Sequence, residues 1–311
     1  QSVDLFLTGN VTWIASESIT IAENVTFSTR DLASGDHEAG VSAGDSGNIH
    51  FISPNILIEE GARLFAHVEE GSSYQAGSIT LEALKGDQTR LGVATSAARI
   101  DVHGELRGGD INLIAHAAAR VSEDARDTNA LRWLATDLLD GLLDLVPQFD
   151  MGFGIADAVA SIVVHDTAVL EASGDIHLDA RATREVSLEA GAEGDLAGVA
   201  AIYGELRGET RAEIRAGAEI GAGGLLAVQA HSDNTLNLDA ATRAGDNDVY
   251  FAGTLAIGIA DGLETVASVA LDAPADGDHA GDILVWARTE NDFRISALNE
   301  ASPGGSVGLA A

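Results

Sequence analysis

The sequence contains no cysteine, a single lysine, few aromatic residues and no long apolar run. Without cysteine there is no disulfide framework, and no thiolate can act as a nucleophile or as a metal ligand. No segment reaches the roughly 18 consecutive apolar residues of a membrane span. These absences predict a chain without disulfides that does not insert into a membrane.

Basic residues are also scarce, because 17 Lys and Arg stand against 49 Asp and Glu, which gives a net charge of −32. Nucleic-acid binding is therefore not expected, since contacts to phosphates need a basic face. An anionic membrane surface is disfavoured for the same reason. Such an acidic chain suits a salty or calcium-containing medium that screens its self-repulsion, so we expect an extracellular or cell-surface location.

One short phrase recurs seven times along the chain. Its copies include "SGNIHFIS", "AGSITLEA", "GGDINLIAHA", "SGDIHLDA" and "AGDILVWA". The glycines that open the seven copies are Gly9, Gly47, Gly77, Gly109, Gly174, Gly224 and Gly281. The intervals are irregular, but recurrence on this scale is typical of stacked architectures.

Each phrase consists of a glycine, a small polar residue and then an apolar alternation. In "GDINLIA", Ile111, Leu113 and Ala115 share one face. A period of two predicts a strand with one buried face. The glycine suits the turn before the strand, where a positive φ is expected.

The sequence predicts an all-β fold, a parallel β-helix with one α-helical insertion. Two or three short strands per unit would form one coil, and coils would stack about 4.8 Å apart. A narrow coil interior fits the abundance of Ala, Val, Ile and Gly and the aromatic content of 5%. The alternative is an antiparallel sandwich of short strands.

From about Glu185 the repeated units become longer.

The segment Asp127–Phe149 breaks the alternation, because leucines recur every three or four residues and aspartates form the opposite stripe. This pattern predicts an amphipathic helix that covers the side or an open end of the solenoid; binding of a protein partner is the alternative. A second helix over Ile155–Val164 or a return to strand is expected next. The predicted organisation is coils over 1–126, a helical insertion over 127–165 and longer coils over 166–311.

The stretch Ala212–Ala230, "AEIRAGAEIGAGGLLAVQA", resembles the repeats of giant secreted bacterial proteins of the filamentous-haemagglutinin and large repetitive adhesin type. A looser match covers Ala267–Ala287. The resemblance implies an exported, right-handed β-helical stalk with a role in adhesion or biofilm. Because "NDFRISALNE" near the C-terminus resembles the start of another unit, we expect the chain to be a fragment of a longer protein. The resemblance carries over no catalytic residue.

Acidic turns supply the candidate metal ligands. Asp276, Asp278 and Asp282 lie close together in "PADGDHAGD", and Ca²⁺ prefers several carboxylate and carbonyl oxygens in a flexible loop. Neither the EF-hand loop nor the calcium nonapeptide is present, so solvated acidic turns are the alternative. The histidines show no tight zinc spacing.

The expected function is that of a rigid, adhesive segment rather than an enzyme. Its expected partners are a glycan or protein on a host or neighbouring cell and other segments of the same long chain. The alternative is a carbohydrate-binding or carbohydrate-active β-helix, with Asp101, His103 and Arg107 as examples of candidate lateral residues. That alternative predicts a lateral cleft with clustered aromatics and paired acids.

Overall fold

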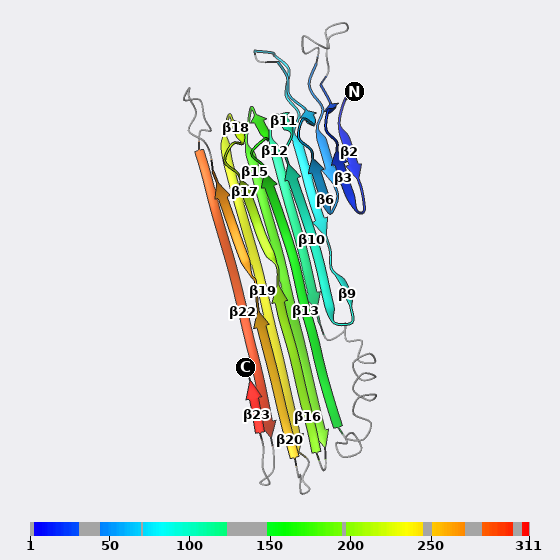
Figure 1. Cartoon of the computed structure of the whole chain (residues 1–311), viewed down its shortest axis with the longest axis vertical. Coiled ribbons are helices and arrows are strands. Elements are labelled where there is room, and N and C mark those ends of the chain that lie inside the picture. Colours follow the sequence, from blue (N-terminus) through cyan, green and yellow to red (C-terminus); the bar gives the residue numbers. More distant parts are fainter. Residues whose placement is uncertain are drawn as a thin grey trace.

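The computed structural model describes residues 3–30, 44–69, 71–122, 148–194, 197–244, 251–270, 282–300 and 307–310. Within these residues every regular element is a β-strand. The strands form three sheets, which we label A, B and C (Figure 1).

Each sheet contains strands that lie far apart in the sequence. Sheet A contains β1 (Val3–Phe6), β4 (Val25–Ser28), β7 (Arg63–Phe65), β11 (Glu105–Gly108), β14 (Val169–Ala172) and β18 (Glu219–Ala222). Sheet B contains β2 (Val11–Ile14), β5 (Ile49–Ile52), β8 (Ile79–Lys85), β12 (Ile111–Val121), β15 (Ile176–Gly194), β19 (Leu225–Ala244) and β22 (Asp282–Glu300). Sheet C contains β3 (Ser18–Ile21), β6 (Asn55–Ile58), β9 (Gln88–Arg90), β10 (Val93–Val102), β13 (Gln148–Val164), β16 (Ala197–Arg207), β17 (Glu209–Ile214), β20 (Phe251–Ala260), β21 (Glu264–Val269) and β23 (Val307–Ala310).

From β1 to β21 the chain visits the sheets in the repeating order A, B, C, and each visit adds a strand beside an earlier one in that sheet. Of the last two described strands, β22 extends sheet B and β23 extends sheet C. All described strand pairs are parallel except β9 with β10. Three parallel sheets built in this order are consistent with a parallel β-helix. The antiparallel sandwich does not describe these strands, since it would pair neighbouring strands in opposite directions.

The seven glycine-led phrases supply the seven strands of sheet B. The residue two positions after each glycine lies in one cross-strand column: Val11, Ile49, Ile79, Ile111, Ile176, Leu226 and Ile283. From Ile49 to Leu226 this column is fully buried. The prediction that the phrases stack in register is therefore confirmed.

The opening glycines are required by close approach between coils. A Cβ added to Gly47 would lie 2.0 Å from the carbonyl oxygen of Gly9, and one added to Gly77 would lie 2.1 Å from that of Gly47. The backbone amides of these glycines also donate to the glycine of the coil before. Gly109 N donates to Gly77 O at 2.6 Å, and Gly174 N donates to Gly109 O at 2.7 Å. The sequence predicts a positive φ at these opening glycines. Among those that the structure describes, only Gly9 has one.

After several of these glycines an Asn or Asp side chain joins one coil to the next. The Oδ1 atom of Asn10 accepts the backbone amide of Asn48 at 2.8 Å, and Oδ1 of Asn48 accepts that of Ser78 at 2.8 Å. Asp110 accepts the amide of Asp175 at 3.0 Å in the same way. A short side chain with an oxygen is therefore favoured here, because it satisfies an amide of the following coil.

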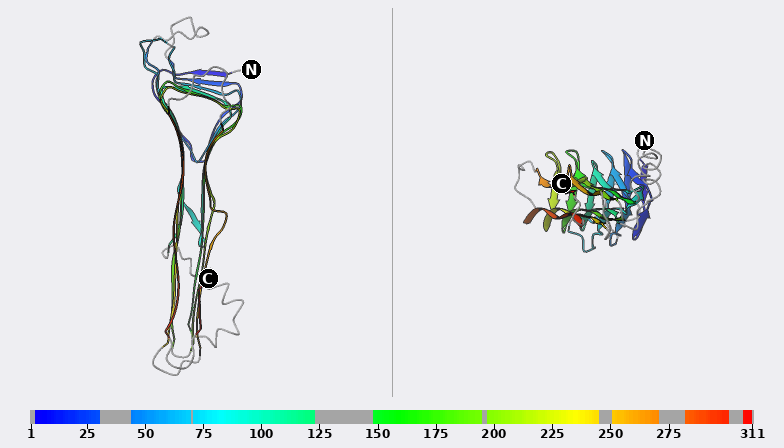
Figure 2. Two further views of the ribbon diagram at one scale, coloured as in Figure 1. Left: turned by 90° about the vertical axis from the view of Figure 1, so that its left-hand side faces the viewer. Right: turned by 90° about the horizontal axis from the view of Figure 1, so that it is seen from below.

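The coils lengthen along the chain, as the view along the stack shows (Figure 2). The first coils form only a three-sided head, whereas later coils add a long extension of two facing layers. Strands of sheet C grow from four residues in β6 to 17 in β13, and those of sheet B from four in β5 to 19 in β15. Lengthening thus begins well before Glu185, where the sequence pattern placed it.

The two-layered extension has a very thin interior. Gly154, Gly204 and Gly258 form one column of sheet C. A Cβ on Gly204 would lie 2.7 Å from Cδ2 of Leu238, which projects from sheet B, and a Cβ on Gly258 would lie 2.5 Å from Cδ1 of Ile295. Glycine on one layer therefore makes room for a branched aliphatic side chain on the other, which brings the layers into close contact.

The helical expectation requires a correction. Most of the helix predicted over Asp127–Phe149 lies outside the described residues, but its last two residues belong to β13. The expected helical insertion over 127–165 is wrong from residue 148 to 164, which form β13. Of the two alternatives for Ile155–Val164, the return to strand is confirmed and the second helix is wrong. Ala156, Ala158 and Ala160 are buried while their neighbours alternate outward. This two-residue period, paired on both sides by β10 and β16, defines a strand in spite of the alanine content.

We expect the Gly77→Ala substitution to destabilise the fold by about 1–3 kcal/mol, because its methyl group forces two coil backbones apart. Gly86→Ala is the matched control, since a Cβ there meets nothing within 4 Å. Denaturant unfolding monitored by circular dichroism measures both. Equal stability of the two variants would contradict the role of close approach.

Candidate functional site

The predicted calcium ligands are only partly described. Asp282 begins β22 and is exposed, whereas Asp276 and Asp278 lie outside the described residues. The calcium site therefore stays a prediction.

The three example lateral residues do not form one cluster. Asp101 lies 3.2 Å from Nε2 of His165, and the His103 and His165 rings stack with centroids 3.6 Å apart. Burial first, and then the neighbouring His165, lower the pKa of His103. Arg107 instead lies on sheet A, where it pairs with Glu105 and Glu171.

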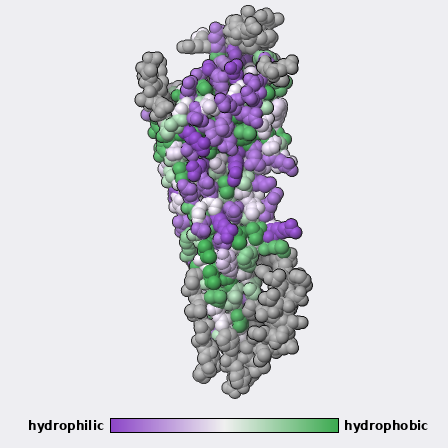
Figure 3. Space-filling model, in the orientation of Figure 1, coloured by the Kyte–Doolittle hydropathy of each residue, from purple (hydrophilic) through white to green (hydrophobic). Residues whose placement is uncertain are grey.

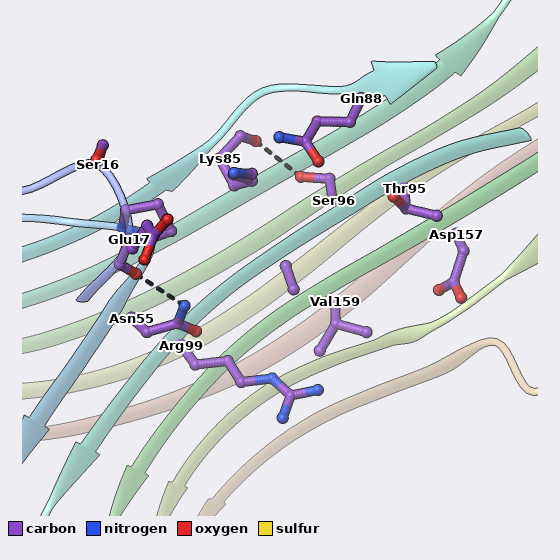
Figure 4. Close-up of a pocket in the computed structure, with 12 residues that line it drawn as sticks. Ser16, Glu17, Asn55, Lys85, Gln88, Thr95, Ser96, Arg99, Asp157 and Val159 are labelled. Carbon is purple, nitrogen blue, oxygen red and sulfur yellow. Dashed lines mark hydrogen bonds between the residues drawn. The ribbon is translucent and has the colours of Figure 1, made fainter. Parts of the chain in front are cut away.

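An open groove of about 420 Å³ lies where short coils give way to long ones (Figure 4). In sheet C, β6 pairs with only the last four residues of β10, so the first part of β10 extends past it. β9 covers that free edge through its antiparallel pairing with Val93–Thr95. The groove is lined by Ser16, Glu17, Pro54, Asn55, Lys85, Gln88, Thr95, Ser96, Ala97, Arg99, Asp157 and Val159.

The groove contains two bases without an ion pair. Most described arginines lie within 4 Å of a carboxylate, as Arg107, Arg181 and Arg211 do. Lys85 and Arg99 have no such pairing with any described carboxylate. Nδ2 of Asn55 donates to Glu17 O at 3.0 Å and keeps one N–H for a ligand, and the amide of Gln88 adds further donors. No aromatic side chain lines the groove.

The outer face of sheet B carries a basic column flanked by acids. His116, Arg181, His231 and Arg288 occupy equivalent positions on four successive strands. Around His231, the ligand atoms of His231, Asp233 and Glu290 lie within 4.8 Å of one another. This is the group in the described part of the chain that could hold a metal ion.

Arg184 of β15 is fully buried at the neck between head and extension. Its Nε and Nη2 donate to Ala158 O at 3.1 and 2.6 Å. Nη1 donates to Ser232 Oγ at 2.8 Å and Asn234 Oδ1 at 3.0 Å, and Nη2 also reaches Thr210 Oγ1 at 3.3 Å. The five donors of the guanidinium are thereby matched by four acceptors from sheets B and C.

The backbone break in sheet C explains this arrangement. The ladder between β13 and its neighbour stops at Asp157 with Arg207 and resumes at Ala160 with Thr210. Gly208 lies in the gap with φ of +119°, and a Cβ there would lie 2.1 Å from Ala158 O. Arg184 supplies the hydrogen bonds to that carbonyl. Burial lowers the pKa of Arg184 to about 10, so the side chain is still a cation at neutral pH.

His67 is a second group whose ionisation is strongly affected by burial. Its ring packs edge-on against Phe65, with centroids 5.3 Å apart, and its Nδ1 is buried without a hydrogen-bond partner. Burial, with smaller effects from Arg30 and Arg107, lowers its pKa to about 4. The side chain is therefore neutral at physiological pH.

No protein-family model, curated protein sequence or solved structure matches the chain. The described residues include no helix with the length and hydropathy needed to cross a bilayer.

Sequence reasoning missed the groove, the buried arginine and the His231 group. His231 and Asp233 are two residues apart in a strand, which places them on one face, but Glu290 is 57 residues further along than Asp233. Only the register of the long coils brings Glu290 beside Asp233. An alignment of the glycine-led phrases at equal offsets would have revealed this pairing.

Replacing Arg184 by methionine should lower the free energy of unfolding by about 1–3 kcal/mol, because buried acceptors at the neck lose their donors. The exposed Arg120 on β12 is the matched control, and Arg120→Met should stay within about 0.5 kcal/mol of the wild type. Chemical denaturation tests both variants. Wild-type stability of Arg184→Met would mean that desolvation of the guanidinium outweighs its hydrogen bonds.

Stability should fall as the pH drops from 6.5 to 4, in part through His67. The folded-state pKa lies below the unfolded value, so the unfolded chain binds the proton first and the loss is complete below pH 4. After allowance for solvent screening we expect about 1–2 kcal/mol from this group. His67→Gln should flatten the pH profile by that amount in thermal unfolding; an unchanged slope would contradict the assignment.

Proposed function

We propose that the chain is a segment of a right-handed parallel β-helix from a large secreted bacterial surface protein of the filamentous-haemagglutinin type. Its role is that of a rigid stalk or binding surface in cell adhesion or biofilm. The observation that carries this proposal is the stacking in register of seven glycine-led strands in sheet B. The right hand follows the strong preference of crossover connections between parallel strands.

Rigidity is supported by the way each coil is bonded to the next. Backbone ladders run through all three sheets, and the glycine amides and the Asn and Asp side chains add bonds at the turns. Because every coil contacts chiefly its neighbours, bending the stack disrupts many hydrogen bonds at once. Such a body transmits force along its length, as a stalk must.

The outer faces support an extracellular role. On sheet A a row of ion pairs crosses three strands, with Arg63 3.3 Å from Glu105 and Arg107 2.7 Å from Glu171. Hydrophilic residues dominate the upper part of the face in Figure 3, with apolar patches lower down. A polar, acidic surface keeps a long repetitive protein soluble and is screened by salt outside the cell.

The groove favours a second candidate function, the binding of carbohydrate. Lys85 and Arg99 would contact a sugar carboxylate, and Asn55 and Gln88 its hydroxyl groups. The groove lacks the clustered aromatics that the carbohydrate alternative predicts, so recognition there would depend on polar groups rather than on stacking.

The test is display of the chain on a non-adherent bacterium, with an unstructured acidic linker of equal length and charge as the control. We expect the displayed chain to increase attachment to coated surfaces or cell–cell aggregation above the linker. Attachment equal to that of the linker would overturn the adhesive role.

The double variant Lys85→Gln/Arg99→Gln distinguishes the two candidates in the same assay. Attachment that survives these changes supports a role for the stack as a whole. Attachment to acidic glycans that is lost in this variant, but kept in Arg90→Gln, assigns recognition to the groove.

A further inference from the structure

The outer face of sheet B brings one imidazole and two carboxylates together on its last two strands. His231 and Asp233 lie two residues apart on β19, and Glu290 of β22 pairs in register with Asp233. Nε2 of His231 lies 3.0 Å from Oδ1 of Asp233 and 3.6 Å from Oε1 of Glu290. All three ligand atoms fall within 4.8 Å of one another.

The histidine nitrogen is positioned as a ligand. Nε2 of His231 is shielded from solvent and makes no hydrogen bond, even though a carboxylate oxygen lies 3.0 Å away. The Trp286 ring lies edge-on to the imidazole, with centroids 5.8 Å apart. Both carboxylates remain about half exposed, with 51% and 47% of their side-chain surface accessible, so an ion can reach them from solvent.

We propose that His231, Asp233 and Glu290 bind a divalent transition-metal ion, with Zn²⁺ as the representative, and thereby clip β22 to β19. Two ligand atoms at about 2.1 Å from a tetrahedral zinc ion lie about 3.4 Å apart, and the observed separations of 3.0 and 3.6 Å lie on either side of that value. Imidazole nitrogen with carboxylate oxygen suits Zn²⁺ and its neighbours, whereas Ca²⁺ takes oxygen ligands. Water would complete the coordination.

Neighbouring arginines compete with the ion. Nη2 of Arg288 lies 2.5 Å from Oε1 of Glu290, the same oxygen that faces His231. Arg181 on β15 also interacts electrostatically with Asp233. Metal binding must therefore displace Arg288 from Glu290, which limits the affinity.

The ligands come from different coils, so binding links them. β22 is the last strand of sheet B in the described part of the chain, and it pairs with that sheet through β19. The ion would hold this strand in register with β19.

The experiment is calorimetric titration of the full chain with ZnCl₂, combined with hydrogen exchange of β22. The wild type should bind one Zn²⁺ and show slower exchange along β22. His231→Gln and Glu290→Gln should each weaken binding by about 100-fold or more, since losing a ligand costs more than losing an outer-shell partner. Arg288→Gln should tighten binding several-fold, because it frees Glu290.

His177→Gln is the matched control, because His177 lies on the same outer face and, among the described carboxylates, is paired with that of Asp175 alone, at 3.6 Å. It should bind Zn²⁺ like the wild type. The proposal is overturned if the wild type takes up no Zn²⁺, if His231→Gln and Glu290→Gln bind it with wild-type affinity, or if Arg288→Gln weakens binding. Circular dichroism confirms that each variant is folded.

Discussion

The close approach of successive backbones at the turn into sheet B determines the rest of the structure. Where Gly47 and Gly77 lie, a methyl group would fall about 2 Å from the carbonyl oxygen of the coil before. Because glycine permits this contact, the strand that follows starts at the same height in every coil. The buried aliphatic column from Ile49 to Leu226 is a consequence of that common starting point.

A second constraint of the same kind shapes the extension. Glycines on sheet C face leucine and isoleucine on sheet B, so two layers pack without room for large side chains on both. Where the layers join the three-sided head, sheet C is interrupted at Gly208, and Arg184 donates to the buried carbonyl of Ala158. The thin interior and the polar neck together let one stack contain coils of very different length, and the step between them forms the groove.

The fold class was predictable because two-residue alternation and recurring glycine are local signals. The seven strands of sheet B were located this way. The region Ile155–Val164 was ambiguous, because alanine suits both a helix and a thin β interior. The groove and the His231 group depend on which coils are long. The length of a coil follows from strand pairing between residues about 30 to 65 positions apart, and no local sequence pattern reports it.

The most direct test of the account is disulfide formation between cysteines placed in the chain, which has none of its own. Asn112 and His177 are cross-strand neighbours on the outer face although 65 residues separate them. Parallel strands place such pairs within disulfide range, whereas a shift of two residues does not. The account predicts that Asn112→Cys/His177→Cys oxidises readily and that Asn112→Cys/Asp179→Cys does not. Stacking in register would be contradicted if the shifted pair oxidised more readily, or if neither pair formed a disulfide.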